Sequence, residues 1–198
     1  MRISEMSYSW NSRMETRGGT KYIVLHHRGG DGDVMSIHRS HQSRGWAGIG
    51  YHFYVRKNGE IWCGRPQNAV GAHCVGFNAM SVGVCFEGNY ENEKSMPETQ
   101  KNAGREIVAY LRRQYPSARV VRHGELTATA CPGKYFPFDE IAKGAESVKK
   151  ELTTANDIVW EISQRVKIND VDGLVRALDA AKKADSPLYW ALRKMVNA

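Results

Sequence analysis

Short apolar runs separated by polar turns mark the first two thirds of the chain. Residues 22–26 (YIVLH) form an apolar, β-rich run that predicts a buried strand, and a polar, glycine-rich stretch follows it. Further strands are predicted at residues 51–55, 60–62, 81–87 and 119–122. The turn Lys57-Asn58-Gly59 lies between the second and third of the five strands and is typical of a β-hairpin. We therefore expect that pair to be antiparallel.

Amphipathic helices are predicted between the strands. Asp33 is a suitable N-cap for a helix that ends before Gly45. The sequence Ser95-Met96-Pro97-Glu98 has the pattern of a capping box and predicts a helix that runs to about Gln114. Another helix is predicted at residues 139–150. Alternating strands and helices with one hairpin predict an α/β fold, in which helices flank a mixed central β-sheet.

Only helical periodicity continues after residue 150. The apolar positions of residues 151–198 fall into three amphipathic groups, and Asn169 and Ser186 are plausible helix caps between them. The chain is therefore predicted to contain a main domain at residues 1–150 and a small all-helical, three-helix module at residues 151–198.

Electric charge is distributed unevenly between these two parts. The chain of 198 residues has a formal net charge of +7 and a pI near 9.3. Residues 151–198 carry equal numbers of basic and acidic side chains, so the excess positive charge lies in residues 1–150. A basic surface favours a polyanionic partner, which leaves nucleic acid, a membrane surface and acidic cell-wall polymers open. Membrane insertion is not expected, because no apolar run is long enough to span a bilayer.

Two features predict synthesis in a cytoplasm with reduced thiols. Residues 1–10 lack the continuous apolar segment of a secretory signal peptide. The cysteines form no CxxC pair and no array typical of secreted disulfide-rich domains; they are Cys63, Cys74, Cys85 and Cys131.

Three candidate metal ligands stand where a sheet enzyme would expose them. His26 ends the first predicted strand, His123 follows the strand at residues 119–122, and Cys131 lies in the loop beyond. Two imidazoles and a thiolate suit zinc and leave a fourth position for water, as in catalytic zinc sites. Composition alone does not decide the matter, because seven histidines offer many accidental pairs and a buried cysteine is usually a small hydrophobic residue.

Four segments that follow one another along the sequence favour the interpretation as a metal site. They are YIVLHH (22–27), GWAGIGYHFYVRKNGEIWCGRP (45–66), VGAHCVGFNAMSVGVCFEGN (70–89) and VRHGELTATACPG (121–133). Over residues 18–142 they resemble the type 2 N-acetylmuramoyl-L-alanine amidases, a family that includes phage lysozymes with amidase activity and the peptidoglycan recognition proteins. The resemblance implies that residues 1–150 are a zinc amidase domain. Such a domain hydrolyses the amide bond between N-acetylmuramic acid and L-alanine in peptidoglycan.

The resemblance also implies which residues bind one zinc ion. The ligands are His26, His123 and Cys131, and the eight-residue step between the last two matches the spacing in the family. His27 is the nearest rival to His26, but the ligand in the family is the first residue after the apolar run. We therefore interpret His27 as a pocket residue that contacts substrate, or as a residue that supports a ligand.

Catalytic roles are implied for two further residues. Tyr51 falls on the tyrosine of the family's GYHF motif, where the phenol hydrogen-bonds the zinc water or the developing oxyanion; the alternative is a core aromatic. Thr129 occupies a position where some amidases carry lysine, and its hydroxyl is expected to hydrogen-bond water or the intermediate. Lys134 is close in sequence and is a candidate to supply the missing positive charge.

Three more positions match the family less specifically. His73 and Asn78 correspond to residues that line the groove and contact the muramyl peptide, although a purely structural role in the loop fits them almost as well. Glu87 resembles an acidic position near the metal and is a candidate base or support for a ligand. The alternative for Glu87 is a surface carboxylate at a strand end.

A wall-directed amidase without a signal peptide suggests a phage or prophage endolysin that leaves the bacterial cytoplasm through a separate membrane pore. Parts of residues 151–198 are similar to endolysins of clostridia and related Firmicutes, so this module is expected to target the cell wall or to form a homo-oligomer. One rival is a non-catalytic peptidoglycan-binding protein of the same fold, although such proteins tend to lose a zinc ligand. The other is a nucleic-acid-binding protein, for which the chain lacks paired Cys/His spacing and an RNP-like aromatic motif.

Overall fold

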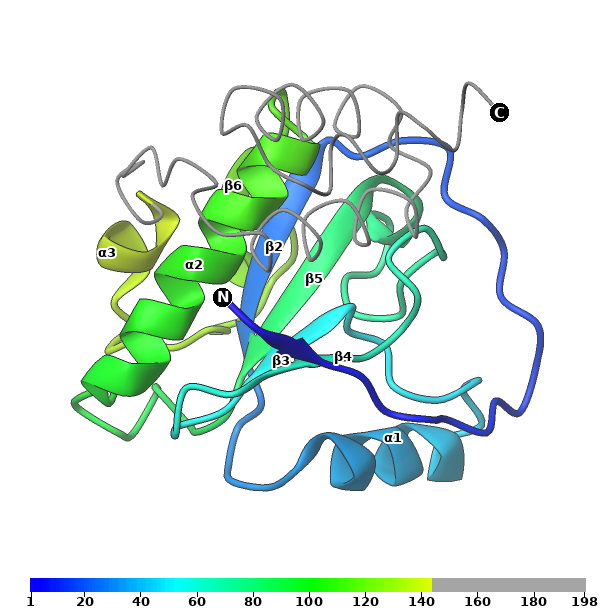
Figure 1. Cartoon of the computed structure of the whole chain (residues 1–198), viewed down its shortest axis with the longest axis horizontal. Coiled ribbons are helices and arrows are strands. Elements are labelled where there is room, and N and C mark those ends of the chain that lie inside the picture. The colour runs from blue at the N-terminus through cyan, green and yellow to red at the C-terminus, as the bar shows by residue number, and fades with distance from the viewer. Residues whose placement is uncertain (144–198) are drawn as a thin grey trace, which may run out of the picture. The chain divides into compact units, whose positions relative to one another are not determined.

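A computed structural model of the protein describes residues 1–143, and they contain a six-stranded β-sheet in the order β1-β4-β3-β5-β2-β6 (Figure 1). The strands are β1 (Ile3–Ser4), β2 (Tyr22–His27), β3 (Phe53–Val55), β4 (Ile61–Cys63), β5 (Ser81–Phe86) and β6 (Arg119–Arg122). All neighbouring strands are parallel except β3 and β4, which the Lys57-Asn58-Gly59 turn connects. The predicted mixed sheet and hairpin are confirmed. The module predicted at residues 151–198 lies outside the described residues, as does the end of the helix predicted at residues 139–150.

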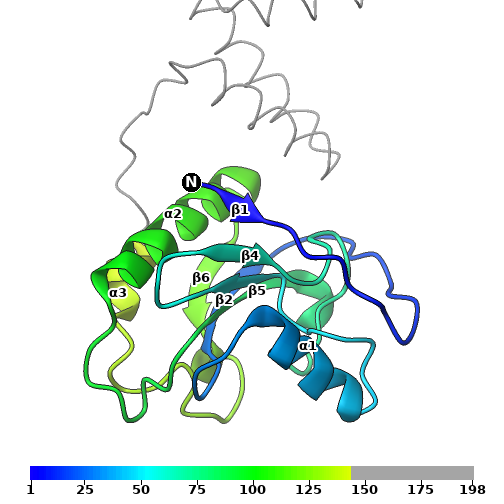
Figure 2. The same ribbon diagram turned by 60° about the horizontal axis from the view of Figure 1, so that its bottom comes forward.

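Helices cover both faces of the sheet (Figure 2). One face carries α1 (Val34–Ser43), and the other carries α2 (Glu98–Gln114) and α3 (Phe138–Ala142). Asp33 caps α1 as predicted, because its carboxylate accepts a hydrogen bond from the Ser36 amide at 2.6 Å. The capping box predicted before α2 is wrong, since Pro97 is the N-cap and no side chain bonds the first turn. Two short 3-10 helices, η1 (Asn78–Met80) and η2 (His123–Glu125), lie in loops.

Strand alternation divides the interior into two cores. The side chains of β5 are buried along its whole length, as expected for a central strand with helices on both sides. On one face, Val34 and Ile37 of α1 belong to the same buried cluster as Cys85. On the other face, the ring of Phe86 lies 5.0 Å from that of Phe136, just before α3. The side chains of consecutive residues near the end of β5 therefore point into different cores. The same holds for the residues of β2 that pair with them.

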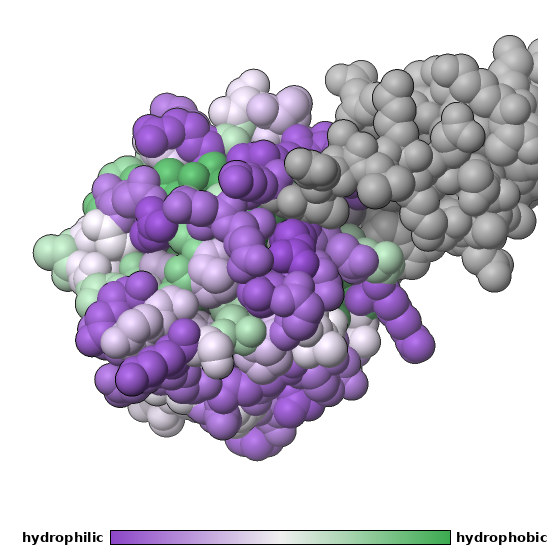
Figure 3. Space-filling model, turned by 90° about the vertical axis from the view of Figure 1, so that its left-hand side faces the viewer, coloured by the Kyte–Doolittle hydropathy of each residue, from purple (hydrophilic) through white to green (hydrophobic). Residues whose placement is uncertain are grey.

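The outer surface over α2 and α3 is largely hydrophilic (Figure 3). On α2, Lys101 and Arg105 each approach the carboxylate of Glu98 to 2.7 Å. This face is therefore compatible with exposure to water. Within residues 1–143, every helix is too short or too polar to cross a bilayer.

The N-terminal segment was not predicted to be structural, but it covers the outer edge of the hairpin. β1 pairs in parallel with β4. The Tyr8 hydroxyl donates to the Cys63 carbonyl oxygen at 2.6 Å, and the Tyr8 ring stacks on His38 at 4.8 Å. A two-residue strand has too few alternating positions to be predicted from sequence. Its pairing nevertheless protects an otherwise open edge of the sheet.

The buried side chain of His52 connects its own segment with two others, those of Gly83 and Ala69. His52 Nδ1 accepts from the Gly83 amide at 3.0 Å, and His52 Nε2 lies 3.0 Å from the Ala69 carbonyl oxygen, to which it donates. Burial lowers the pKa of His52 to about 3, although the bond to Ala69 acts in the opposite direction. His52 is therefore neutral at physiological pH.

We expect this neutral histidine to make the fold sensitive to acid. The folded-state pKa of about 3 lies below the value of about 6.5 for an unfolded histidine, so below that pH the unfolded chain binds a proton that the folded chain does not. The stabilisation is complete above about pH 6.5 and is lost as the pH falls toward 3. His52→Gln should remove this dependence.

Urea unfolding of both proteins, followed between roughly pH 5.5 and 4.5, provides the measurement. The free energy of unfolding of the variant should fall less steeply, by about 1.4 kcal/mol per pH unit, because one linked proton is removed. Carboxylates titrate in both proteins and cancel in the comparison. Equal slopes would show that His52 is not the group responsible.

Candidate functional site

The three predicted metal ligands converge on one point. His26, His123 and Cys131 each offer a ligand atom, and these atoms all lie within 4.8 Å of one another. The ring centroids of His26 and His123 are 4.4 Å apart, and His26 Nδ1 lies 3.8 Å from the Cys131 sulfur. Within residues 1–143, no other group of histidines, cysteines and carboxylates has this geometry.

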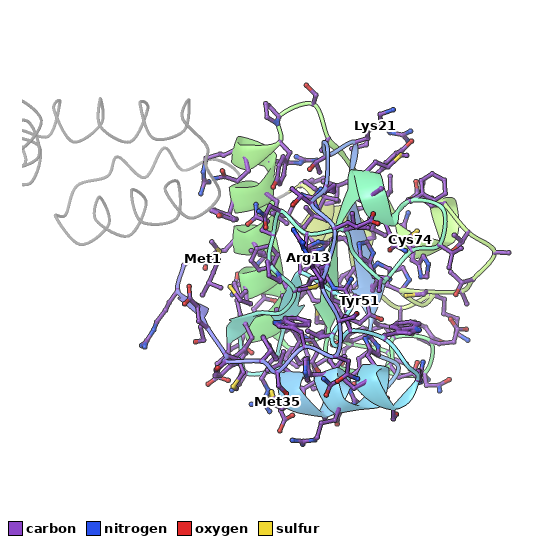
Figure 4. All side chains as sticks on the ribbon, turned by 90° about the vertical axis from the view of Figure 1, so that its right-hand side faces the viewer. Met1, Arg13, Lys21, Met35, Tyr51 and Cys74 are labelled. Atoms are coloured by element: carbon purple, nitrogen blue, oxygen red, sulfur yellow. The ribbon has the colours of Figure 1, made fainter. Side chains whose placement is uncertain are left out.

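Parallel strand pairing explains why the two histidines are adjacent. Leu25 of β2 is in register with Arg122 of β6. His26 follows Leu25 in β2, and His123 directly follows the end of β6, so the two histidines emerge together at the same edge of the sheet. Lys21, just before β2, lies at the other end of that strand, well away from Tyr51 (Figure 4).

A tight loop brings Cys131 back to the histidines. The Gly124 amide donates to the Cys131 carbonyl oxygen at 2.9 Å and closes the loop that begins with η2. A side chain at position 124 would not fit, because a Cβ there would lie 2.5 Å from the Thr129 carbonyl oxygen. The glycine after His123 is therefore part of the ligand geometry.

Burial keeps the cluster uncharged in the absence of a cation. It lowers the pKa of His26 well below the usual histidine value, and His123 lowers it further by repulsion. Burial also lowers the pKa of His123. Burial raises the pKa of the Cys131 thiol to about 11. The three side chains are therefore two neutral imidazoles and a thiol, and none of them carries a positive charge that would repel a cation.

The donor set fits a zinc ion. Tetrahedral coordination with Zn–N and Zn–S bonds of about 2.0 and 2.3 Å would place a nitrogen and a sulfur donor roughly 3.5 Å apart. The observed separation of His26 Nδ1 and Cys131 Sγ is 3.8 Å. This distance is long for a direct hydrogen bond between uncharged groups. It is closer to the distance expected between two ligands of one metal ion.

Tyr51 lies beside the cluster, as its predicted role requires. Its ring centroid is 5.1 Å from that of His26. Burial raises the pKa of the Tyr51 hydroxyl well above its usual value, and the nearby thiols of Cys85 and Cys131 add to the effect. The Arg65 amide donates to the Tyr51 carbonyl oxygen at 2.8 Å and holds the backbone in place. The phenol is therefore protonated and able to donate a hydrogen bond.

Thr129 and Lys134 have different surroundings. Thr129 is exposed, and its hydroxyl oxygen accepts from the Cys131 amide at 3.3 Å, which places it next to the candidate ligand. The Lys134 ammonium pairs with the Glu91 carboxylate at 3.3 Å. Lys134 thus already has an acidic partner, so the structure gives no support for a compensating charge at Thr129.

Strand alternation distinguishes His26 from His27. His26 is paired with Cys85 on the α1 side of the sheet, whereas His27 is paired with Phe86 on the opposite side. His27 Nδ1 accepts from the Tyr90 amide at 3.0 Å. The geometric cluster contains His26 and not His27.

His73 and Asn78 make hydrogen bonds within the fold. His73 is buried, and its Nδ1 lies 3.0 Å from Nε2 of His26. The Asn78 side-chain oxygen accepts from the amides of His73 and Cys74 at 2.8 and 2.9 Å. The contacts of Asn78 therefore organise its own loop, and those of His73 support a candidate ligand.

Glu87 is neither a surface carboxylate nor a member of the cluster. It is buried, and its two oxygens accept from the amides of Gly32 and Lys57 at 3.0 and 2.9 Å. Arg56 approaches it to 3.5 Å. These contacts tie the loop after β2 to the hairpin, so the carboxylate is occupied by structural bonds.

Two residues near the site were not identified from sequence. No functional role was assigned to Cys85 from the sequence, but it is paired with His26 and its thiol lies next to Tyr51. The ring of His41, on α1, lies 5.7 Å from that of Tyr51 and 4.7 Å from the partly exposed Trp46. Strand register would have indicated Cys85, but no sequence pattern places α1 against Tyr51.

The chain is similar in sequence and in fold to several known proteins. An endolysin of Enterobacteria phage K11 is 38% identical over 126 residues, which cover 61% of this chain and 82% of the phage protein. The solved N-acetylmuramoyl-L-alanine amidase LysC from Clostridium intestinale is 39% identical, with a TM-score of 0.69 and coverage of 71% of this chain and 95% of that one. Drosophila PGRP-LB is 26% identical, with a TM-score of 0.63 and coverage of 71% and 92%. The family model described as N-acetylmuramoyl-L-alanine amidase matches residues 16–134, a segment that includes the three converging residues and Tyr51, and the chain belongs to this family.

Proposed function

We propose that this amidase depends on zinc and cleaves the amide bond between the lactyl group of N-acetylmuramic acid and the L-alanine of the stem peptide. The convergence of His26, His123 and Cys131 carries the proposal. Family membership supports amidase activity on peptidoglycan. The donor chemistry adds the metal, because two neutral imidazoles and a thiol are the ligands that zinc prefers.

The ligands would hold zinc at the edge of the sheet with one position left open. Zinc bound in this way supplies a Lewis acid for the carbonyl and lowers the pKa of a water molecule to about 7. The chain contributes a rigid frame around it. His26 and His123 are fixed by strand register, and the Gly124 amide fixes the loop that carries Cys131.

Tyr51 and Thr129 would act on the substrate. The Tyr51 phenol remains protonated and lies beside His26, so it can donate to the carbonyl oxygen as negative charge develops there. Thr129 is exposed next to Cys131 and can donate its hydroxyl proton to water or to the intermediate.

The biological role we propose is that of a phage or prophage endolysin. Proteins named endolysin from phages K11, KP32 and T7 are 32 to 38% identical to the chain over the aligned residues. Release from the cytoplasm through a separate pore belongs to this proposal, as does wall targeting or self-association through residues 151–198. A non-catalytic peptidoglycan-binding role is less well supported, because the three ligand residues and Tyr51 are all present.

The first test concerns zinc and its thiolate ligand. Chelation should abolish release of peptides from purified sacculi, and added zinc should restore it, because the three proposed ligands would hold a removable ion. Cys131→Ala should remain inactive even with added zinc. Cys63→Ala is the matched control, since Cys63 lies on β4 and should leave zinc content and activity intact. Full activity of metal-free protein, or of Cys131→Ala, would contradict zinc dependence.

The second test concerns the Tyr51 hydroxyl. Tyr51→Phe should keep the zinc content and the fold but lower turnover by about a hundredfold or more, as when an oxyanion donor is removed elsewhere. Steady-state hydrolysis of a soluble muramyl peptide provides the measurement. Tyr54→Phe is the control, because it removes a buried hydroxyl that bonds the Gly32 carbonyl oxygen. If both variants turn over at the wild-type rate, Tyr51 has only a packing role.

The third test concerns the domain boundary. A protein ending at Ala145 should fold and cleave soluble muramyl peptides at nearly the full-length rate, because all residues of the site lie before position 135. Its lytic potency on intact cells should fall, since residues 151–198 are proposed to target the wall or to assemble the enzyme. Loss of activity on the soluble peptide would assign these residues to the catalytic fold instead.

A further inference from the structure

We infer that His73 is a positioning residue that fixes the tautomer of His26, through a hydrogen-bond chain that begins at the backbone carbonyl of Phe77. The inference rests on the proposed function, because it treats His26 as a metal ligand. It differs from the substrate contact that the sequence suggested for His73. The chain runs through Phe77, Ser81, His73 and His26, and each link determines the next.

The first link fixes the proton of the Ser81 hydroxyl. Ser81 Oγ lies 2.8 Å from the Phe77 carbonyl oxygen. A carbonyl cannot donate, so the single hydroxyl proton of Ser81 must point toward Phe77. Toward any other neighbour, the Ser81 oxygen can act only as an acceptor.

The second link fixes the tautomer of His73. His73 Nε2 lies 3.4 Å from Ser81 Oγ. The Ser81 hydroxyl already donates its proton to Phe77, so Nε2 of His73 must carry the proton of this contact. In a neutral imidazole the other nitrogen is then bare. Nδ1 of His73 is therefore an acceptor.

The third link reaches the metal ligand. His73 Nδ1 lies 3.0 Å from His26 Nε2, so the proton between them belongs to His26. With Nε2 protonated, Nδ1 of His26 has a free lone pair. That nitrogen is the one 3.8 Å from the Cys131 sulfur. The series of hydrogen bonds therefore leaves Nδ1 of His26 free to bind a cation.

Close packing holds the His73 ring in the orientation that the chain requires. A Cβ at Gly83 would lie 2.6 Å from the His73 ring, and a Cβ at Gly71 would lie 2.5 Å from it. The ring of His52 packs edge-on at 5.5 Å. Because only glycine leaves room for the imidazole on two sides, His73 occupies a slot with little space to rotate.

A metal ligand oriented in this way should bind more tightly than a free imidazole. Loss of such an outer partner typically weakens metal affinity by about 10- to 100-fold. His73→Leu keeps a buried side chain but has no acceptor for His26, so its zinc Kd should rise by that factor. In His73→Asn, the side-chain oxygen can take the place of Nδ1 and should restore part of the affinity.

The variants are tested in the full chain by competition for zinc with a chromogenic chelator and by hydrolysis of a soluble muramyl peptide at saturating zinc. We expect His73→Leu to lower kcat while KM stays at the wild-type value. His38→Leu is the matched control, because His38 is also buried and bonds the Ser9 oxygen and the Ile49 amide away from the cluster. It should lower stability without changing the zinc Kd.

Other outcomes would overturn the inference. An unchanged zinc Kd with a raised KM in His73→Leu would make His73 a substrate contact, and equal losses of zinc affinity in His73→Leu and His38→Leu would indicate general loosening. If the wild-type chain itself binds no zinc, the proposed function fails, and that result is read independently of His73.

The tautomers can also be measured without any variant that must fold. Long-range ¹H–¹⁵N NMR of the metal-free wild-type protein distinguishes the two neutral forms of each histidine. We expect His26 and His73 both to carry their proton on Nε2 before zinc is added. A proton on Nδ1 of His26 would overturn the inference, since that nitrogen could not then accept the metal.

Discussion

The parallel pairing of β2 with β5 and β6 is the constraint on which the site depends. Pairing with β6 in register places His123 beside His26, and pairing with β5 places Cys85 beside the same residue. Neither relation is local in sequence, because each strand comes from a different part of the chain. Helices cover both faces of the sheet, and a shift of one residue in β2 would turn His26 to the opposite face, away from Cys131. The stability of the sheet therefore also fixes the position of the candidate ligands.

Backbone hydrogen bonds carry this order from the sheet into the loops. The Gly124 amide closes the loop that carries Cys131, and the Arg65 amide holds Tyr51. The Arg65 side chain is buried and donates to the carbonyl oxygens of Ile49 and Val70 at 3.0 and 2.8 Å. Loops that surround active sites are often mobile, but these have little freedom because their polar groups are satisfied internally. A fixed frame of this kind suits catalysis that relies on preorganised donors.

Much of the fold followed from the sequence, whereas the finer roles in the site did not. The apolar run at residues 22–26 and the turn at Gly59 identify β2 and the hairpin, because strand burial and turn chemistry leave local patterns. The series of hydrogen bonds from Ser81 through His73 to His26 leaves no such pattern in the sequence. It depends on which side chains of different strands and loops come together on one face of the sheet. The role of Glu87 was missed for the same reason, because its carboxylate contacts two backbone amides and the Arg56 side chain, which lie far from it in sequence. The spacing of residues predicts which ones can converge, but it does not reveal which nitrogen or oxygen each one presents.

The buried histidines show how that missing information can be obtained from a structure. At His38 and His52, one nitrogen accepts from a backbone amide and the other donates to a carbonyl oxygen, so both are fully used within the fold. His73 is also fully used, by Ser81 and His26. His26 differs, because its Nε2 has a partner while its Nδ1 faces only a protonated thiol 3.8 Å away. A buried nitrogen lone pair without a close donor is unfavourable unless a cation completes it. By this criterion His26 differs from His38, His52 and His73, whose nitrogens are used to hold the structure around it.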